Sequence, residues 1–363
     1  MDFRRIENLP PYVFSIINGL KIEARRAGHD VVDLGFGNPD IPSPDVAVAK
    51  LAEAAQNPKN HRYSLSRGLP KLREAIAGYY KDKWNVDLDP ELEITNTIGS
   101  KEGFTHLMWV LLDRGDAAIV PSPSYPIHMY GPLFAGADLR QVPMKFLANP
   151  SQRENFADDF MDSLNTAWDV GWPKPRVLVI SFPHNPTGAT VDLAFMQRVV
   201  DFCREKEMIV VHDHAYADIG FDGHEPPSIL QAEGAKECAV ELYSMTKSFS
   251  MSGWRCAFLL GNADVVQALV KIKSYLDYGM FQPVQIAATV TINEAADFPD
   301  QVRGVYESRC DTLIDGLSRI GWDVPKPGGT MFVWAPIPEA YAEMGSVEFC
   351  SHVVREADVA LSP

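Results

Sequence analysis

Short apolar runs that alternate with helical patterns are the feature that most constrains the fold of this 363-residue chain. Several runs have the length and composition of buried strands, and longer segments with helical spacing separate most of them. Apolar strands joined through helices form a mainly parallel sheet with helices on both faces, because both faces must be buried. The runs are EITN (93–96), AAIV (117–120), RVLVIS (176–181), MIVVHD (208–213), AVELYS (239–244) and CAFLLG (256–261).

The two ends of the chain suggest a second, smaller domain. Apolar residues recur at helical spacing over residues 13–20, which predicts an amphipathic helix ending near Gly28. From about residue 262 the pattern turns mostly helical and closes with a helix and a strand-like segment. We therefore predict an α/β protein of three parts: an N-terminal arm with part of a small domain (1–45), a large domain (46–285) and a small α+β domain (286–363).

Composition narrows the classes of function. The formal charge of −15 leaves no excess of basic residues to neutralise a phosphate backbone, which argues against nucleic-acid binding. The five cysteines lie far apart without CxxC spacing, which argues against a disulfide framework and a zinc site. No run has the length of a signal-peptide core or the roughly 18 apolar residues of a membrane span. We expect a cytoplasmic protein that acts on small molecules, without membrane contact or a metal site.

Polar residues follow the predicted strands, and ligands bind beyond the carboxyl ends of strands in such sheets. Gly99 and Ser100 can open a helix whose free N–H groups bind an anion, although an ordinary serine N-cap gives the same pattern. Asn185 lies in the Pro/Gly-rich turn FPHNPTG, for which a bare turn is the alternative. Asp213 ends an apolar strand, and Tyr216 follows three residues later. A buried carboxylate needs a cation or a strong hydrogen-bond donor, which a ligand could supply. A structural salt bridge within the protein is the alternative.

The segment YSMTKSFSMSGWRC (243–256) adds Ser244, Lys247 and Arg255 after the next strand. Taken alone, it also fits a solvated loop. Together, the strand-end residues offer groups for an anion, an acid at Asp213 for a basic nitrogen, and an amine at Lys247 for an electrophilic carbon. Pyridoxal phosphate has those three chemical features.

These motifs make the chain resemble the fold-type I, class I/II aminotransferases, which use pyridoxal 5'-phosphate on an aspartate aminotransferase-like fold. The family pattern S-x-x-K followed by G-x-R stands here as SMTKSFSMSGWR, N-P-T-G as FPHNPTG, D-x-x-Y as DHAY, and the early substrate loop as VVDLGFGNPD. The resemblance implies that Lys247 is the catalytic lysine, which bonds covalently to the cofactor, and that Asp213 binds the ring nitrogen. It also implies that Asn185 and Tyr216 contact the ring hydroxyl and that Tyr125 stacks on the ring.

The resemblance assigns the phosphate and substrate contacts as well. Phosphate ligands would come from Ser100, Lys101, Ser244 and Arg255, with Tyr63 reaching across from the partner subunit of a homodimer. Gly37 and Tyr12 would line the substrate side. In this family, the arginine that binds the substrate α-carboxylate lies beyond the final LSP, so we expect the chain to continue there.

The implied reaction is transamination between an amino acid and a 2-oxo acid. Several segments, among them YSLSRGLPKLREAI and KIKSYLDYG, most resemble the bacterial glutamate–pyruvate (alanine) aminotransferases. Transfer from L-alanine to 2-oxoglutarate, giving pyruvate and L-glutamate, is therefore the first expectation. LL-diaminopimelate and aspartate aminotransferases are the alternatives nearest to it.

Other classes of protein remain open or are argued against. A pyridoxal-phosphate-dependent C–S lyase would carry the same lysine and aspartate, and a non-catalytic ligand-binding regulator is a further alternative. A dinucleotide-binding dehydrogenase is disfavoured, because VVDLGFGNPD lacks the third glycine and the helix that should follow it. We expect His128 and His184 to be hydrogen-bonded residues beside the site and Tyr275 to pack, and the role of Tyr278 is left open.

Overall fold

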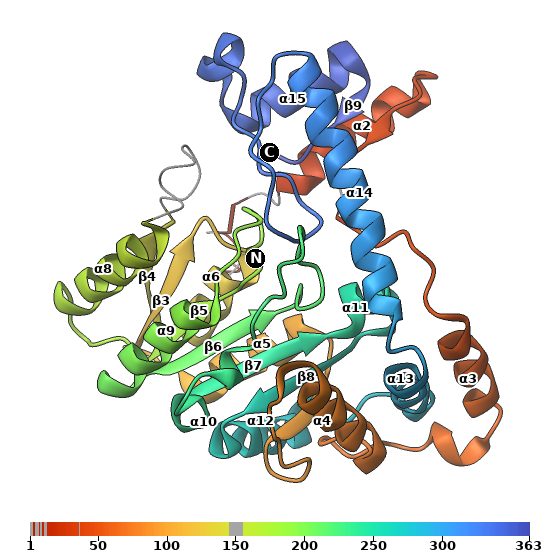
Figure 1. The fold of residues 1–363 in the computed structure, drawn as a ribbon, viewed down its shortest axis with the longest axis vertical. Coiled ribbons are helices and arrows are strands. Elements are labelled where there is room, and N and C mark those ends of the chain that lie inside the picture. The colour runs from red at the N-terminus through yellow and green to blue at the C-terminus, as the bar shows by residue number, and fades with distance from the viewer. Residues whose placement is uncertain (1–2, 4–6, 8, 11–12, 36, 145–154) are drawn as a thin grey trace. The chain divides into compact units, whose positions relative to one another are not determined.

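The computed structural model describes residues 3, 7, 9–10, 13–35, 37–144 and 155–363 (Figure 1). The chain forms two compact units, and the boundary between them crosses one helix, α14 (Phe298–Arg319). The larger unit contains Pro39–Ile314 and Pro325–Trp334, and the smaller one Met1–Asn38, Asp315–Val324 and Ala335–Pro363. The domain boundaries expected from the sequence stay a prediction.

A seven-stranded sheet forms the centre of the larger unit, in the order β2-β8-β7-β6-β5-β3-β4. Strand β8 runs antiparallel to both of its neighbours, and the other neighbouring pairs are parallel. Strand β4 was not predicted, because it lies at the edge of the sheet and most of its residues are not buried. The strands are β2 (Ile94–Ile98), β3 (Ala117–Ser122), β4 (Asp138–Pro143), β5 (Val177–Ile180), β6 (Ile209–His214), β7 (Ala239–Ser244) and β8 (Cys256–Gly261).

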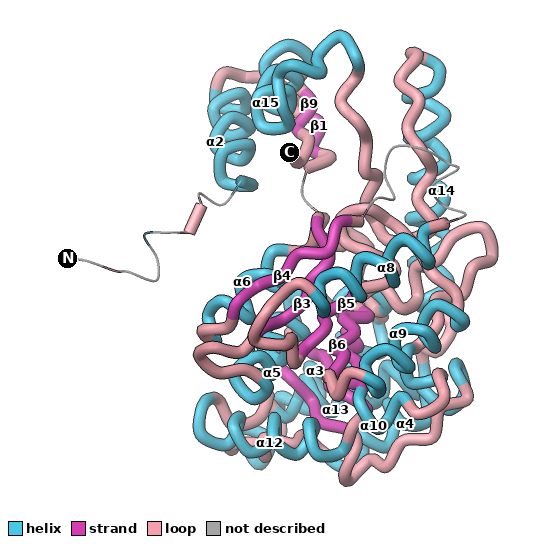
Figure 2. The backbone as a smooth tube through the Cα atoms, turned by 90° about the vertical axis from the view of Figure 1, so that its left-hand side faces the viewer, coloured by secondary structure: helices cyan, strands magenta, loops and turns pink. Residues whose placement is uncertain are grey.

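Helices cover both faces of this sheet, as the apolar strands predict (Figures 1 and 2). One face packs against α5 (Ser100–Leu111), α6 (Pro126–Ala135) and α12 (Ala263–Leu276). The opposite face packs against α4 (Pro70–Trp84), α8 (Phe156–Asp169), α9 (Leu193–Glu205) and α13 (Gln282–Glu294). The remaining helices of this unit include α3 (Asp45–Ala55), α10 (Ala235–Cys238) and α11 (Met245–Ser248).

The smaller unit has its own core. Helix α2 (Val13–Arg26), predicted from its spacing, packs with α15 (Gly345–Ala357). Strands β1 (Val32–Asp33) and β9 (Val359–Ala360) form a parallel pair. The segment VVDLGFG therefore contributes a two-residue strand outside the seven-stranded sheet, unlike the glycine-rich turn of a dinucleotide-binding domain. Among the described helices of both units, none combines the length and apolarity needed to span a bilayer.

Candidate active site

The alternation of side chains along β6 aims Asp213 at the face of the sheet that α5 and α6 cover. Its Oδ2 lies 2.8 Å from His128 Nε2, and His128 Nδ1 lies 3.0 Å from Ser124 Oγ on the other side of the ring. Oδ1 of Asp213 is buried and has no hydrogen-bond partner among the described residues. An oriented, buried carboxylate with one open oxygen can accept a hydrogen bond from a ligand N–H group.

Lys247 lies on α11, the short helix that begins directly after β7. Burial lowers the pKa of its ammonium group to about 8, because the charged form loses hydration. Its Nζ lies 5.9 Å from the centre of the Tyr216 ring. A lysine amine that is partly neutral near pH 8 can act as a nucleophile or as a base.

Asn185 and Tyr216 come together from the turn after β5 and the segment after β6. The Asn185 amide Nδ2 donates to the Tyr216 hydroxyl oxygen over 3.4 Å. Burial and the nearby Asp213 carboxylate raise the pKa of Tyr216 well above its ordinary value. The phenol therefore keeps its proton at neutral pH and can donate it to an acceptor on a ligand.

The turn between β2 and α5 has the features of an anion-binding site. Gly99 is the N-cap of α5 with φ of 81°, and a Cβ there would overlap the guanidinium of Arg255. Ser100 Oγ is buried, with no partner in the described part of the chain. The guanidinium thus lies against the start of a twelve-residue helix, where backbone N–H groups and a free hydroxyl are available.

Three further predicted residues lie in the same part of the larger unit. Tyr125 directly precedes α6, and its ring centre lies 5.7 Å from that of His128 in an edge-on arrangement. Lys101 Nζ lies 5.2 Å from the centre of the Tyr125 ring. Ser244 is the buried N-cap of α11, where its Oγ accepts a hydrogen bond from the Thr246 N–H over 3.2 Å.

The structure leaves the roles of three predicted residues untested. Tyr63 is 92% exposed, and its ring packs on that of Tyr278 with the centres 5.5 Å apart. Gly37 belongs to the smaller unit, and Tyr12 lies outside the described residues. Their roles remain predictions. The expectation that Tyr275 packs within the chain was wrong, because that side chain is 84% exposed at the end of α12.

The two histidines near the site are hydrogen-bonded. The sequence did not reveal that His128 bridges Ser124 and Asp213; the four-residue spacing of Ser124 and His128 at a helix start was the available signal. His184 Nδ1 lies 2.8 Å from Thr187 Oγ1. Burial, with a smaller effect from the neighbouring His128, lowers the pKa of His184 to about 3, so the His184 ring stays neutral.

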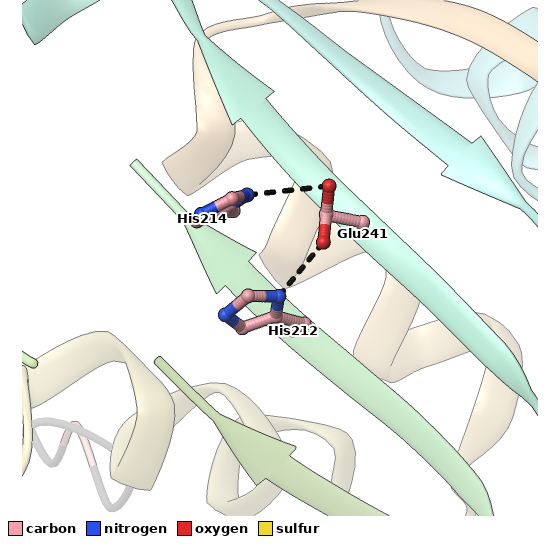
Figure 3. Close-up of side chains that lie close together, drawn as sticks. All are labelled: His212, His214 and Glu241. Carbon is pink, nitrogen blue, oxygen red and sulfur yellow. Dashed lines mark hydrogen bonds and ion pairs between the residues drawn. The ribbon is translucent and has the colours of Figure 1, made fainter. Parts of the chain in front are cut away.

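A second polar cluster lies on the opposite face of β6 (Figure 3). His212, His214 and Glu241 are fully buried and close enough together to hold a metal ion. The Glu241 carboxylate, however, already accepts hydrogen bonds from the hydroxyls of Tyr80 and Ser228, over 2.6 and 2.8 Å. Its other oxygen lies 2.8 Å from His212 Nδ1. We assign this cluster to the buried polar network that joins β6 to β7.

Pyridoxal phosphate fits the groups around Asp213 and Lys247. Within the described part of the chain, Asp213 Oδ1 has no partner and matches a ring N–H; Ser100 Oγ has none there either and, with Arg255, matches a phosphate. The Lys247 amine, with its lowered pKa, matches an aldehyde. This arrangement defines a pyridoxal-phosphate-dependent enzyme.

Comparison with known proteins identifies the family. The family model described as aminotransferase class I and II matches residues 29–363, and the chain belongs to this family. The chain is 46% identical over 361 residues to the glutamate–pyruvate aminotransferase AlaC of Escherichia coli K12, covering 99% of this chain and 85% of that protein. It is 41% identical over 362 residues to the LL-diaminopimelate aminotransferase of Moorella thermoacetica, covering 100% and 90%.

A solved structure gives the same result for the fold. The substrate-bound BacF structure from Bacillus subtilis superimposes with a TM-score of 0.90 at 34% identity and covers 99% of this chain and 88% of that one. The α/β fold of the aspartate aminotransferase type, the class of enzyme and the dependence on pyridoxal phosphate are therefore confirmed as predicted from the motifs.

Proposed function

We propose that this aminotransferase transfers the amino group of L-alanine to 2-oxoglutarate, giving pyruvate and L-glutamate. The observation that carries the reaction type is the match of residues 29–363 to the aminotransferase class I and II model. Within the described residues, Asp213, whose Oδ1 lacks a partner, and Lys247, with its lowered pKa, are the groups that this reaction would use. The choice of alanine rests on the 46% identity to a glutamate–pyruvate aminotransferase over nearly the whole chain.

Lys247 is the proposed catalytic residue. When bound, pyridoxal phosphate supplies an aldehyde that condenses with amines and a ring that withdraws electrons from the substrate α-carbon. Lys247 Nζ would hold the cofactor covalently until an incoming amino acid displaces it. The released amine, which its lowered pKa keeps partly neutral, would then accept the proton from the substrate α-carbon.

The other residues would bind and orient the cofactor. Asp213 Oδ1 would accept a hydrogen bond from the ring nitrogen while His128 holds the second oxygen. Asn185 and Tyr216 would contact the ring hydroxyl, since their polar groups already lie together. Tyr125 would stack on the ring. The phosphate would be bound by Ser100, Lys101, Ser244 and Arg255.

The proposed active form is a cytoplasmic homodimer. Exposed aromatic and aliphatic side chains gather around Tyr63 and Tyr278 in the larger unit, and a partner subunit would cover them. Tyr63 would then reach the phosphate of the partner's cofactor. The other exposed apolar side chains of this surface are Leu65, Tyr275, Leu276 and Phe281.

LL-diaminopimelate is the second candidate donor, because an enzyme that is 41% identical over the whole chain carries that name. Aspartate is a third. A panel of L-alanine, L-glutamate, L-aspartate and LL-diaminopimelate, each tested with pyruvate and with 2-oxoglutarate, separates these candidates. Preference for LL-diaminopimelate would replace the alanine proposal and leave the site assignment intact.

The same preparation tests the chemistry. Borohydride reduction of the purified protein, followed by peptide mapping, should place the cofactor on Lys247, and Lys247→Ala should carry none. Release of pyruvate and a thiol from a sulfur amino acid, without any 2-oxo acid acceptor, would instead indicate a C–S lyase. Cofactor binding without turnover of any donor would indicate a ligand-binding regulator.

A further inference from the structure

A group of charged side chains lies between α5 and α12, apart from the residues assigned above. Lys273, Glu102, His106 and Asp277 form this group, called here the Lys273 cluster. The Lys273 side chain is only 1% exposed, and its Nζ lies 2.8 Å from Glu102 Oε1 and 3.2 Å from Asp277 Oδ1. His106 Nδ1 lies 2.6 Å from the same Glu102 oxygen and 3.5 Å from Asp277 Oδ2. One buried cation therefore lies between two carboxylates from different helices.

The carboxylate of Glu102 contacts the turn proposed to bind the cofactor phosphate. Glu102 lies in the first turn of α5, and its Oε2 accepts a hydrogen bond from the backbone N–H of Ile98 over 2.7 Å. Ile98 ends β2, and Gly99 and Ser100 follow it directly. Lys273 and the Ile98 N–H hold the two oxygens of Glu102, which fixes the strand-to-helix turn that places Ser100 and the first N–H groups of α5.

The carboxylate of Asp277 lies next to the surface that we propose the partner subunit covers. Asp277 is the C-cap of α12, and the backbone N–H groups of Asp277 and Tyr278 both donate to the Lys273 carbonyl oxygen, over 3.1 and 3.0 Å. Tyr278 has a left-handed backbone with φ of 59°, and its ring packs on that of Tyr63. The contact between Lys273 and Asp277 thus holds the chain reversal that presents the Tyr63–Tyr278 pair.

The charges explain why this arrangement depends on Lys273. A buried ammonium is stable only when it is well paired, and its removal would leave two neighbouring carboxylates without their shared cation. Burial raises the pKa of Glu102, but the contacts with His106 and Lys273 outweigh this and lower it to about 2. Burial and the charge of Glu102 raise the pKa of Asp277. The ammonium already occupies the cation position among the three possible metal ligands Glu102, His106 and Asp277.

Building on the proposed function, we propose that Lys273 is a positioning residue that couples the phosphate-binding turn of its own subunit to the Tyr63–Tyr278 surface offered to the partner subunit. The coupling runs through Glu102 in one direction and through Asp277 in the other. Cofactor binding and dimer formation would then share one buried ion pair network.

Two equilibria measured on the apoprotein test this coupling. One is the dissociation constant of pyridoxal phosphate, followed by absorbance, and the other is the dimer dissociation constant from analytical ultracentrifugation without cofactor. Lys273→Met should weaken both by about tenfold, which corresponds to about 1.4 kcal/mol and lies within the range of interaction energies measured inside such networks. Lys271→Met, at an exposed position of the same helix, is the matched control and should change neither.

Variants of Glu102 and Asp277 test separately the contact to the phosphate-binding turn and the contact to the dimer surface, called here the cofactor branch and the dimer branch. Glu102→Ala should weaken cofactor binding and leave the dimer constant near that of the wild type. Asp277→Asn should weaken the dimer and leave cofactor binding near that of the wild type when binding is measured at protein concentrations well above the dimer dissociation constant, so that Tyr63 of the partner subunit stays in place. Each of these variants leaves Lys273 paired with one carboxylate and should therefore fold. They test the proposal even if Lys273→Met does not fold. Both constants unchanged in Lys273→Met, or equal losses of both in the two carboxylate variants, would overturn the proposal.

The outcomes also distinguish this inference from the proposed function. A wild-type protein that binds no pyridoxal phosphate contradicts the proposed function itself. A wild type that binds the cofactor and transaminates, together with a Lys273→Met variant of unchanged affinities, contradicts only the coupling. A wild type that is active as a monomer overturns the dimer branch.

Discussion

Replacing Lys247 with methionine should make the apoprotein more stable, and it should also abolish the covalent bond to the cofactor that we propose for this lysine. Burial lowers the pKa of Lys247 from an ordinary value of 10.5 to about 8, so the folded protein holds an ammonium group that has lost hydration. At about 1.4 kcal/mol per pH unit, this difference corresponds to about 3 kcal/mol of destabilisation at neutral pH. Methionine has a similar length and no charge, so it should recover up to that amount.

The pH dependence of this gain identifies its cause. Between about pH 8 and 10.5 the unfolded chain still binds the lysine proton and the folded chain has released it, so wild-type stability rises with pH across this window. The advantage of Lys247→Met should therefore be largest below pH 8 and shrink toward pH 10.5. Burial of the methionine thioether in place of the lysine amine adds a contribution that does not change with pH.

Urea unfolding of cofactor-free protein, followed by tryptophan fluorescence at about pH 7 and about pH 9.5, measures the difference in free energy of unfolding below the window and well inside it. Lys271→Met controls for removal of an exposed lysine from the same unit. A variant that is less stable than the wild type at pH 7, or a stability gain of equal size at both pH values, would refute the reasoning.

Three further predictions concern other parts of the chain. His128→Phe should weaken pyridoxal phosphate binding by roughly tenfold, because Asp213 loses the partner that orients it, and a titration of the apoenzyme followed by absorbance measures this. Gly99→Ala should destabilise the protein by about 1–3 kcal/mol, since alanine is strained at φ of 81° and its Cβ would overlap Arg255; a midpoint of urea unfolding equal to that of the wild type would contradict this. The five cysteines, all buried, should react with a thiol reagent far faster in urea than in the native state, and Cys256, whose pKa burial raises to about 12, should be among the slowest native thiols; rapid native labelling at that position would show the assignment of its burial to be wrong.

The motif residues and most strands could be predicted because their signals are local. An apolar run followed by Asp213 and Tyr216, or by Ser244 and Lys247, is visible within a dozen residues. The structure has strands at each of the predicted runs, within one or two residues at their ends. Strand β4 gave no such signal, because an edge strand with few buried residues lacks both the apolar run and the alternation.

By itself, the sequence determined the class of fold and the cofactor, and it indicated the side chains that we propose carry the chemistry, because strand ends, turns and helix starts are encoded by neighbouring residues. Only the tertiary structure decided how those side chains are held. His128 meets Asp213 across 85 positions of sequence, and Lys273 meets Glu102 across 171. Such pairs depend on which helix covers which face of the sheet, and that depends on how the whole chain buries its apolar surface rather than on any local pattern.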